Sequence, residues 1–240
     1  MRGWPPHEVV GLGDWLLRAS DGVSSGRANS ALPLGDPGVD LPAALDQVED
    51  FYAARSLDAL LAAPRPGSEE VAALAARRGW SAGHDIHVLA VDLDRVPPEV
   101  PAVPGDVAVR LDDAPDEEWF LRSRTDVEVL GPGARRLVAG GDRPRVFASV
   151  RDRRGRALAV ARGVLSDGWL GLFSVETHPD ARRRGLASAL VAQVLAWGRP
   201  HGAGASYLQV RASNHAAAAL YDGLGYRRHH TYRYLTAPPR

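Results

Sequence analysis

The stretch HPDARRRGLASALV, residues 178–191, places three consecutive arginines directly before a glycine and an apolar helical pattern. A helix N-terminus already carries a partial positive charge, so cations there are unfavourable unless a negative group binds nearby. Gly185 allows a tight turn, after which several free N–H groups at the helix start can point toward one ligand. The pattern Arg-x-x-Gly-x-Ala, residues 182–187, therefore predicts a phosphate or pyrophosphate site, with a solvated arginine patch as the alternative.

The overall composition makes this positive charge a local feature. The chain has 240 residues, a formal net charge of zero, 45% hydrophobic and 24% charged residues, and no cysteine. A neutral balance disfavours nucleic-acid and anionic-membrane binders, because both need a broad basic surface. The absence of cysteine excludes thiolate nucleophiles and cysteine-based metal sites. No apolar run reaches membrane-spanning length, so we expect a soluble, cytoplasmic protein.

A proline-rich stretch, VPPEVPAVPG at residues 96–105, is the clearest linker. Its prolines remove backbone donors and favour an extended chain. We therefore expect two domains, with a smaller N-terminal domain over residues 1–95 and a catalytic domain over residues 106–240.

The second domain has the pattern of a layered α/β domain, a β-meander followed by alternating strands and helices. Strands are expected over residues 107–113, 145–152, 157–165, 169–176, 205–212 and 226–235. Helical stretches are expected over residues 116–124, 131–141, 184–198 and 213–225.

The first domain has a reduced version of this pattern. Strands are expected over residues 15–20, 28–35 and 83–93, and helices over 42–55 and 68–80. The end of this domain aligns with the end of the second, which favours a duplicated fold. The aligned pairs are Gly79 with Gly225, Trp80 with Tyr226, His84 with His230, and Leu89 with Leu235.

Three stretches in order, GLFSVETHP (171–179), RRRGLA (182–187) and VRASNHAAAALYDGLGY (210–226), resemble the GNAT superfamily of acyl-CoA N-acyltransferases. The resemblance covers residues 106–236. It implies a GNAT-like mixed sheet flanked by helices. The preceding domain resembles the degenerate first half of bacterial two-domain GNAT proteins.

The resemblance also implies roles for individual residues. The loop would hold the pyrophosphate of acetyl-CoA, the strand before it would bind the pantetheine arm and the thioester oxygen, and Asn214 would bond the pantetheine. Tyr221 would be the general acid for the departing thiolate. The cofactor-binding residues implied are Val175, Arg182, Arg183, Arg184, Gly185, Leu186, Ala187, Ser188 and Asn214.

Each role has a structural alternative. Val175 is also a natural core strand residue, and Asn214 is a natural helix N-cap. Tyr221 lies on an alanine-rich helix, where packing alone explains an aromatic side chain. The pair His229–His230 is better explained by a strand surface than by metal binding, because no third ligand has the usual spacing.

One position departs from the pattern of the GNAT enzymes that acetylate ribosomal-protein N-termini. Those enzymes carry a glutamate before VRASN that serves as the base, and this chain has Gln209 there. An amide cannot take a proton at neutral pH, so the base must lie elsewhere or act through water. Glu176, at the end of the preceding strand, is the nearest acidic candidate, and a solvated carboxylate is its alternative.

The sequence therefore predicts an acetyl-CoA-dependent N-acetyltransferase that transfers acetyl directly to a primary amine, on a small molecule or a protein N-terminus. The alternative is a non-catalytic acyl-CoA-binding regulatory module, which Gln209 favours. We expect no metal and no nucleic-acid or membrane partner; a homodimer is possible.

In the first domain, DPGVD at 36–40 has no arginine and two carboxylates, so we expect no second CoA site, with Asp40 capping the next helix.

Overall fold

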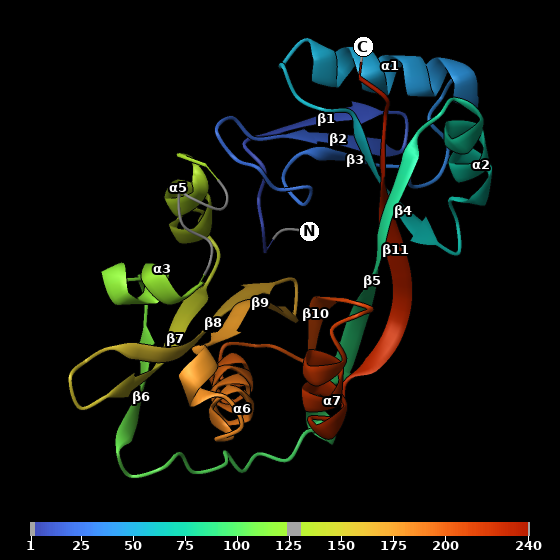
Figure 1. Cartoon of the computed structure of the whole chain (residues 1–240). Helices are drawn as coiled ribbons and strands as arrows, with labels where there is room; N and C mark the ends of the chain where they lie inside the picture. Colours follow the sequence, from blue (N-terminus) through green and yellow to red (C-terminus); the bar gives the residue numbers. More distant parts are fainter. Residues whose placement is uncertain (1–2, 124–130, 240) are drawn as a thin grey trace.

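The computed structural model describes residues 3–123 and 131–239. Their strands form one mixed sheet in the order β1-β2-β3-β4-β11-β5-β10-β9-β8-β7-β6 (Figure 1). The strands are Glu8–Leu12 (β1), Trp15–Ala19 (β2), Ser30–Leu32 (β3), Leu60–Arg65 (β4), Ser81–Asp92 (β5), Val107–Asp112 (β6), Arg145–Asp152 (β7), Ala157–Ser166 (β8), Trp169–Thr177 (β9), Ala205–Arg211 (β10) and Arg227–Thr236 (β11). The sheet bends so that its two ends face each other across the N-terminal segment.

Helices cover this sheet on both faces. They are Leu41–Ala53 (α1), Glu69–Arg77 (α2), Glu117–Ser123 (α3), Ala134–Ala139 (α5), Leu186–Gly198 (α6) and His215–Gly223 (α7), with 3₁₀ turns at Leu93–Arg95 and Pro179–Ala181. The expected α/β class, a mixed sheet flanked by helices, is confirmed. Arg124, the last residue of the helix expected over 116–124, lies outside the described residues.

Three apolar cores follow from the strand alternation, because successive side chains of a strand point to opposite faces. Val146 and Ala148 of β7 face α6, whereas Phe147 between them faces Trp119 of α3. The first half has its own core, in which Val48 of α1 is fully buried. Asp40 caps α1 as expected, because its carboxylate accepts a hydrogen bond from Ala43 N at 2.8 Å.

The centre of the sheet joins the two halves by a reciprocal exchange of strands. In the order β4-β11-β5-β10, the last strand lies between β4 and β5 of the first half, and β5 lies between β10 and β11 of the second. Each half therefore contributes one long antiparallel strand to the other half.

The pairing between β5 and β11 follows the alignment of the two halves. Leu89 pairs with Arg228, and the residues that correspond to them, Leu235 and Ala82, also pair with each other. Ile86 pairs with Tyr232, its own counterpart, so a pseudo-twofold axis passes through this pair. The alignment thus predicted a real symmetry relation.

The proline-rich segment connects the halves without helix or strand. It runs from Val96 to the start of β6 across one side of the molecule (Figure 1). Since one sheet passes through both halves, the boundaries 1–95 and 106–240 stay a prediction.

Candidate active site

The candidate site begins where two parallel strands separate. β9 and β10 pair from Ala205 with Trp169 to Leu208 with Leu172, and their pairing ends there. Beyond this point Val175 and Glu176 of β9 and Gln209 of β10 line one cavity of about 520 Å³. The backbone of β9 therefore has no partner strand on its β10 side, which leaves donors and acceptors directed into an opening.

A bulge shapes the β9 side of this cavity. Two residues, Ser174 and Val175, lie opposite the single Ala161 of β8, and Ser174 has a positive φ of 51°. Such bulges re-aim backbone and side chains beside functional sites. The Ser174 hydroxyl is buried and has no hydrogen-bond partner among the described residues, although it lines the cavity. A buried polar atom of this kind marks a place where a ligand atom can bond.

The start of α6 supplies further donors. Gly185 adopts φ 73° as the N-cap, a left-handed conformation that favours glycine. The first helical hydrogen bond runs from Ala189 N to Gly185 O at 3.1 Å, so the N–H groups of residues 186–188 have no partner within the helix. Free N–H groups at a helix start, together with the helix dipole, are suited to binding an anion.

The three arginines before Gly185 differ in their contacts. Arg182 and Arg183 are exposed, whereas Arg184 is half-buried and donates to both carboxylate oxygens of Asp106, at 2.9 and 2.8 Å. The Leu186 side chain is buried in the core beneath the turn. The predicted loop residues therefore lie on one turn, and the guanidinium of Arg184 is already paired with a carboxylate of the protein.

Helix α7 brings Asn214 and Tyr221 to the same cavity. Both side chains line it together with Ala217, as expected for positions about one and two turns apart. Asn214 also caps α7, because its side-chain oxygen accepts from Ala217 N at 3.2 Å. Asn214 is therefore the N-cap of α7 and at the same time a residue of the cavity wall.

Tyr221 is buried, and its ring packs edge-on against Tyr226 with the centroids 5.7 Å apart. Burial, with the charge of Glu176 as a smaller cause, raises the pKa of Tyr221 to about 12. The phenol is thus protonated at neutral pH and can donate a proton. Glu176 interacts electrostatically with this hydroxyl, so the predicted acid and base share one environment.

A second cavity of about 320 Å³ adjoins the first and shares Arg27, Gln209, Tyr232 and Tyr234 with it. Its remaining wall comes mainly from the first half, including Leu32. The Tyr232 hydroxyl donates to Gln209 Oε1 at 3.3 Å. The first half therefore helps to wall the space next to Gln209.

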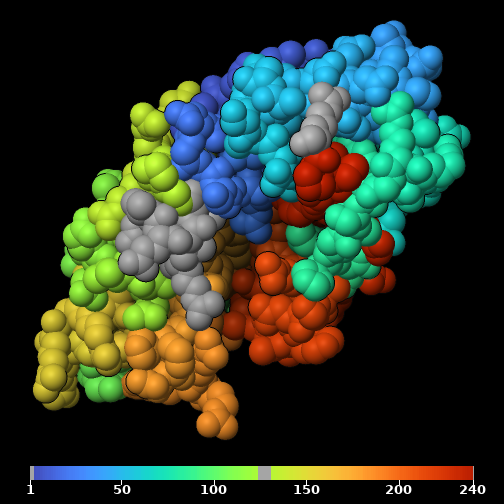
Figure 2. Space-filling view, turned by 45° about the horizontal axis from the view of Figure 1, so that its top comes forward, coloured from blue at the N-terminus to red at the C-terminus, as the bar shows by residue number. Residues whose placement is uncertain are grey.

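Several wall residues were missed by sequence reasoning. Tyr232 and Tyr234 occupy alternate positions of a predicted strand, so their side chains share one face of the sheet. The alternation does not indicate which part of the molecule lies against that face. Arg27 lies in a loop of the first half, distant in sequence from Tyr232 and Tyr234, and lines the same cavity. A hollow separates the surface of α6 from that of α7 (Figure 2).

The two adjacent histidines contact each other, with their Nδ1 atoms 2.9 Å apart. Burial and the neighbouring His229 hold the pKa of His230 below its usual range. Within residues 3–123 and 131–239, no group of three or more His, Cys, Asp or Glu side chains is arranged to hold a metal ion. In the described part of the chain, no helix is both long and apolar enough to cross a membrane.

Parallel strands that separate, a glycine turn at a helix start and a tyrosine on the next helix form the arrangement expected of a GNAT fold. A GCN5-related N-acetyltransferase from Kribbella flavida has the same fold, with a TM-score of 0.73, 21% identity, and coverage of 98% of this chain and 91% of that chain. A tandem GNAT protein from the clavulanic acid biosynthesis pathway superposes with a TM-score of 0.66 and 17% identity, over 88% of this chain and 76% of that chain.

The chain belongs to the family described as "Probable histone acetyltransferase Rv0428c C-terminal", which matches residues 1–235, and it is a GNAT N-acetyltransferase. The Mycobacterium tuberculosis protein "Probable histone acetyltransferase Rv0428c" is 31% identical over 245 residues, covering 98% of this chain and 70% of that protein. The "[Ribosomal protein bS18]-alanine N-acetyltransferase" of Escherichia coli K12 is 35% identical over 86 residues, which are 36% of this chain and 57% of that enzyme.

Proposed function

We propose that this protein transfers an acetyl group from acetyl-CoA directly to a primary amine. The observation that carries the proposal is the single cavity in which the unpaired backbone of β9, Glu176 and Tyr221 meet. No covalent enzyme intermediate is needed, because an amine and a thioester can react when both are bound in this space.

The residues fit acetyl-CoA by their chemistry. The pyrophosphate would bind the N–H groups at the start of α6, with Arg182, Arg183 and Ser188 beside them. The pantetheine would bond the free backbone groups of β9 around Val175 and the side chain of Asn214. A β9 N–H and the unpartnered Ser174 hydroxyl would stabilise the oxyanion that forms at the thioester carbonyl.

The transfer needs one proton taken and one proton given. The amine loses a proton to Glu176, directly or through water, as its nitrogen forms a bond to the carbonyl carbon. The carbon–sulfur bond then breaks, and Tyr221 donates a hydrogen bond or a proton to the sulfur. Gln209 cannot act as a base, but its side chain can position the acceptor, as can Tyr232, which bonds to it.

The acceptor is best matched by an α-amino group. Deprotonating an amine of pKa near 10.4 at neutral pH costs about 4–5 kcal/mol, whereas an α-amine near 8 costs only about 1 kcal/mol. A carboxylate that acts through water is an adequate base for deprotonating an α-amine. The names of the two relatives, a histone and a ribosomal-protein acetyltransferase, support a protein acceptor.

The test measures thiol release from acetyl-CoA over a panel of amines. The panel contains small amines, peptides with a free N-terminus and no lysine, and the same peptides with a blocked N-terminus and one lysine. Turnover with the free N-terminal peptides, exceeding that with the lysine peptides, is the expected result. Turnover with lysine peptides alone would contradict the α-amine assignment.

A second function, non-catalytic acyl-CoA binding, is favoured by Gln209 at the position of the missing glutamate. It predicts CoA binding by calorimetry with no thiol release above the uncatalysed rate for any amine. A cytoplasmic location, where acetyl-CoA is available, belongs to the proposal, and homodimer formation stays a prediction.

A further inference from the structure

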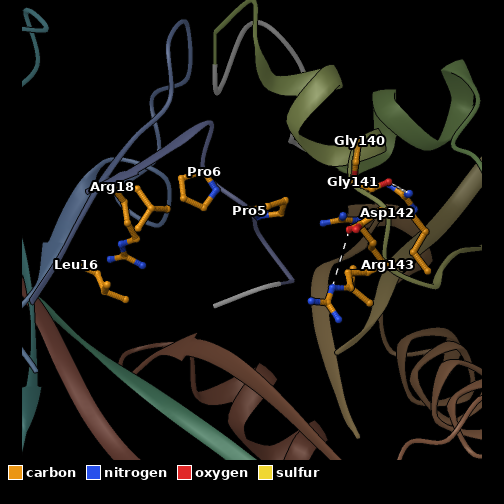
Figure 3. A pocket seen from close by; sticks show the side chains of 12 residues that line it. Pro5, Pro6, Leu16, Arg18, Gly140, Gly141, Asp142 and Arg143 are labelled. Atoms are coloured by element: carbon orange, nitrogen blue, oxygen red, sulfur yellow. Dashed lines mark hydrogen bonds and ion pairs between the residues drawn. The ribbon is translucent and has the colours of Figure 1, made fainter. Parts of the chain in front are cut away.

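A third cavity, of about 400 Å³, lies between the two ends of the bent sheet. Leu16 and Arg18 of β2 lie at one side, the loop from α5 to β7 lies at the other, and Pro5 and Pro6 lie between them (Figure 3). Arg162 and Val164 of β8 complete the lining. None of its lining residues belongs to the cavity of Tyr221, so this space is separate from the proposed acyl site.

Arg162 is the unusual member of this lining. Its side chain is only 1% exposed and lies 5.8 Å from the centroids of three aromatic rings, those of Trp4, Phe147 and Phe173. One terminal nitrogen donates to Gly3 O at 3.1 Å, but Nε has no hydrogen-bond partner among the described residues. Burial, with nearby Arg145 as a smaller cause, lowers the pKa of Arg162 to about 9, so it is still a cation at neutral pH.

The other charged groups of the cavity do not neutralise Arg162. Arg18 donates to the backbone and side-chain oxygens of Ser30, and Arg145 donates to the backbone carbonyls at the end of α5, including that of Gly141. The Asp142 side chain is 96% exposed and lies 3.9 Å from Arg143 Nε, at the solvent side of the cavity. In the described part of the chain, no carboxylate forms an ion pair with Arg162.

A buried cation without a counter-ion is costly, and an anion that enters the cavity would remove that cost. Among the residues that line this cavity, Arg162 supplies the buried donor without a partner, Nε, and its planar guanidinium fork matches the two oxygens of a carboxylate. Beside the charged groups, Pro5, Pro6, Leu16 and Val164 give the cavity an apolar section of wall. Apolar wall combined with a few polar and charged groups is typical of sites for small organic molecules.

We propose that this cavity binds a small organic monocarboxylate, whose carboxylate pairs with Arg162 and whose apolar body lies against Leu16, Val164 and the two prolines. Binding of a carboxylate in this cavity does not depend on bound acetyl-CoA or on the hydroxyl of Tyr221. Arg18 also lines the cavity beside Gln209, so a ligand bound here lies next to the proposed acceptor space.

The experiment titrates the full chain with hexanoate at constant ionic strength and measures heat and melting temperature. Hexanamide has the same body without the charge, and inorganic phosphate has charge without the body. We expect saturable heat and a rise in melting temperature with hexanoate only, because a ligand that binds the folded state stabilises it. No saturable response to hexanoate, or a response to phosphate alone, would overturn the proposal.

The matched pair of variants is Arg162→Met and Arg154→Met. Each removes one positive charge, but Arg154 is exposed in the turn between β7 and β8 and lies outside the cavity lining. Hexanoate affinity should fall about tenfold or more in Arg162→Met, since hydrogen bonds to charged groups are among the stronger ones, and should stay unchanged in Arg154→Met. Equal affinity in both variants would overturn the assignment of Arg162.

A second variant covers the case in which Arg162→Met does not fold. Leu16 is half-buried at the cavity wall, and Leu16→Trp fills the space while keeping Arg162. It should lose hexanoate binding with a melting temperature close to that of the parent. A folded Leu16→Trp protein that binds hexanoate as the parent does would show that the ligand is held elsewhere.

Discussion

Replacing Tyr221 with phenylalanine removes one hydroxyl and tests its role as the acid. The pKa of about 12 sets the expected size of the effect. General-acid help is typically worth about 10²–10⁴-fold, and it is greatest when the pKa of the acid lies near the working pH. A phenol near 12 is far from that optimum, so we expect the lower end, a fall of about 100-fold in kcat, or about 2.7 kcal/mol of barrier.

The neighbouring Tyr226 provides the matched control. It is 2% exposed, packs against Tyr221, and lies outside the cavity lining, with its hydroxyl 2.7 Å from Ser206 Oγ. Tyr226→Phe should leave kcat unchanged and lower the free energy of unfolding by about 1 kcal/mol through the lost hydrogen bond.

The assay is single-turnover acetyl transfer with both substrates saturating, so that the chemical step is observed. The parent should lose no activity through ionisation of Tyr221 up to about pH 11, because a group with a pKa of about 12 keeps its proton below that pH. CoA affinity should be the same in the parent and in Tyr221→Phe. Equal rates for the Tyr221 and Tyr226 variants would refute the assignment and leave Tyr221 as a packing residue.

Three further changes test the rest of the proposed site. Gly185→Ala should lower stability by about 1–2 kcal/mol, because its φ of 73° is unfavourable for any side chain, and calorimetry should show weaker CoA binding. Glu176→Gln should lower kcat at neutral pH without changing CoA affinity, and the loss should shrink above pH 8, where an α-amine deprotonates unaided. Arg182→Met should weaken CoA binding more than Arg184→Met does, since Arg184 is held by Asp106; equal effects in calorimetry would contradict this.

Most of the second half could be predicted from the sequence because its elements have clear local patterns. The strand over 145–152 has the expected bounds, and α6 begins two residues after the expected position. The strands β1 and β4 were missed. The segment of β4, LLAAPR, is rich in alanine and contains Pro64, and it becomes a strand because β3 and β11 flank it. Pairing with neighbouring strands, and not local propensity, therefore makes this segment a strand.

The candidate site could be predicted where it depends on one continuous segment. The turn before α6 and the cap of α7 are local, so Gly185 and Asn214 lie where the pattern implied. The positive φ of Ser174 was not predictable, since serine rarely marks a left-handed position. The contribution of the first half depends on the exchange of strands, and strand order is set by long-range contacts. The roles assigned to these residues stay predictions.

The exchanged strands also determine the order in which the molecule can be completed during synthesis. β5 ends at Asp92, but its two neighbours are formed by residues 205–211 and 227–236. At about 5–20 residues per second, a ribosome needs roughly 6–30 seconds to make the chain from the end of β5 to these neighbours. Throughout that time β5 presents unpaired backbone, which is a template for aggregation. The last strand then completes both halves in one step, so neither half reaches its final pairing before the other.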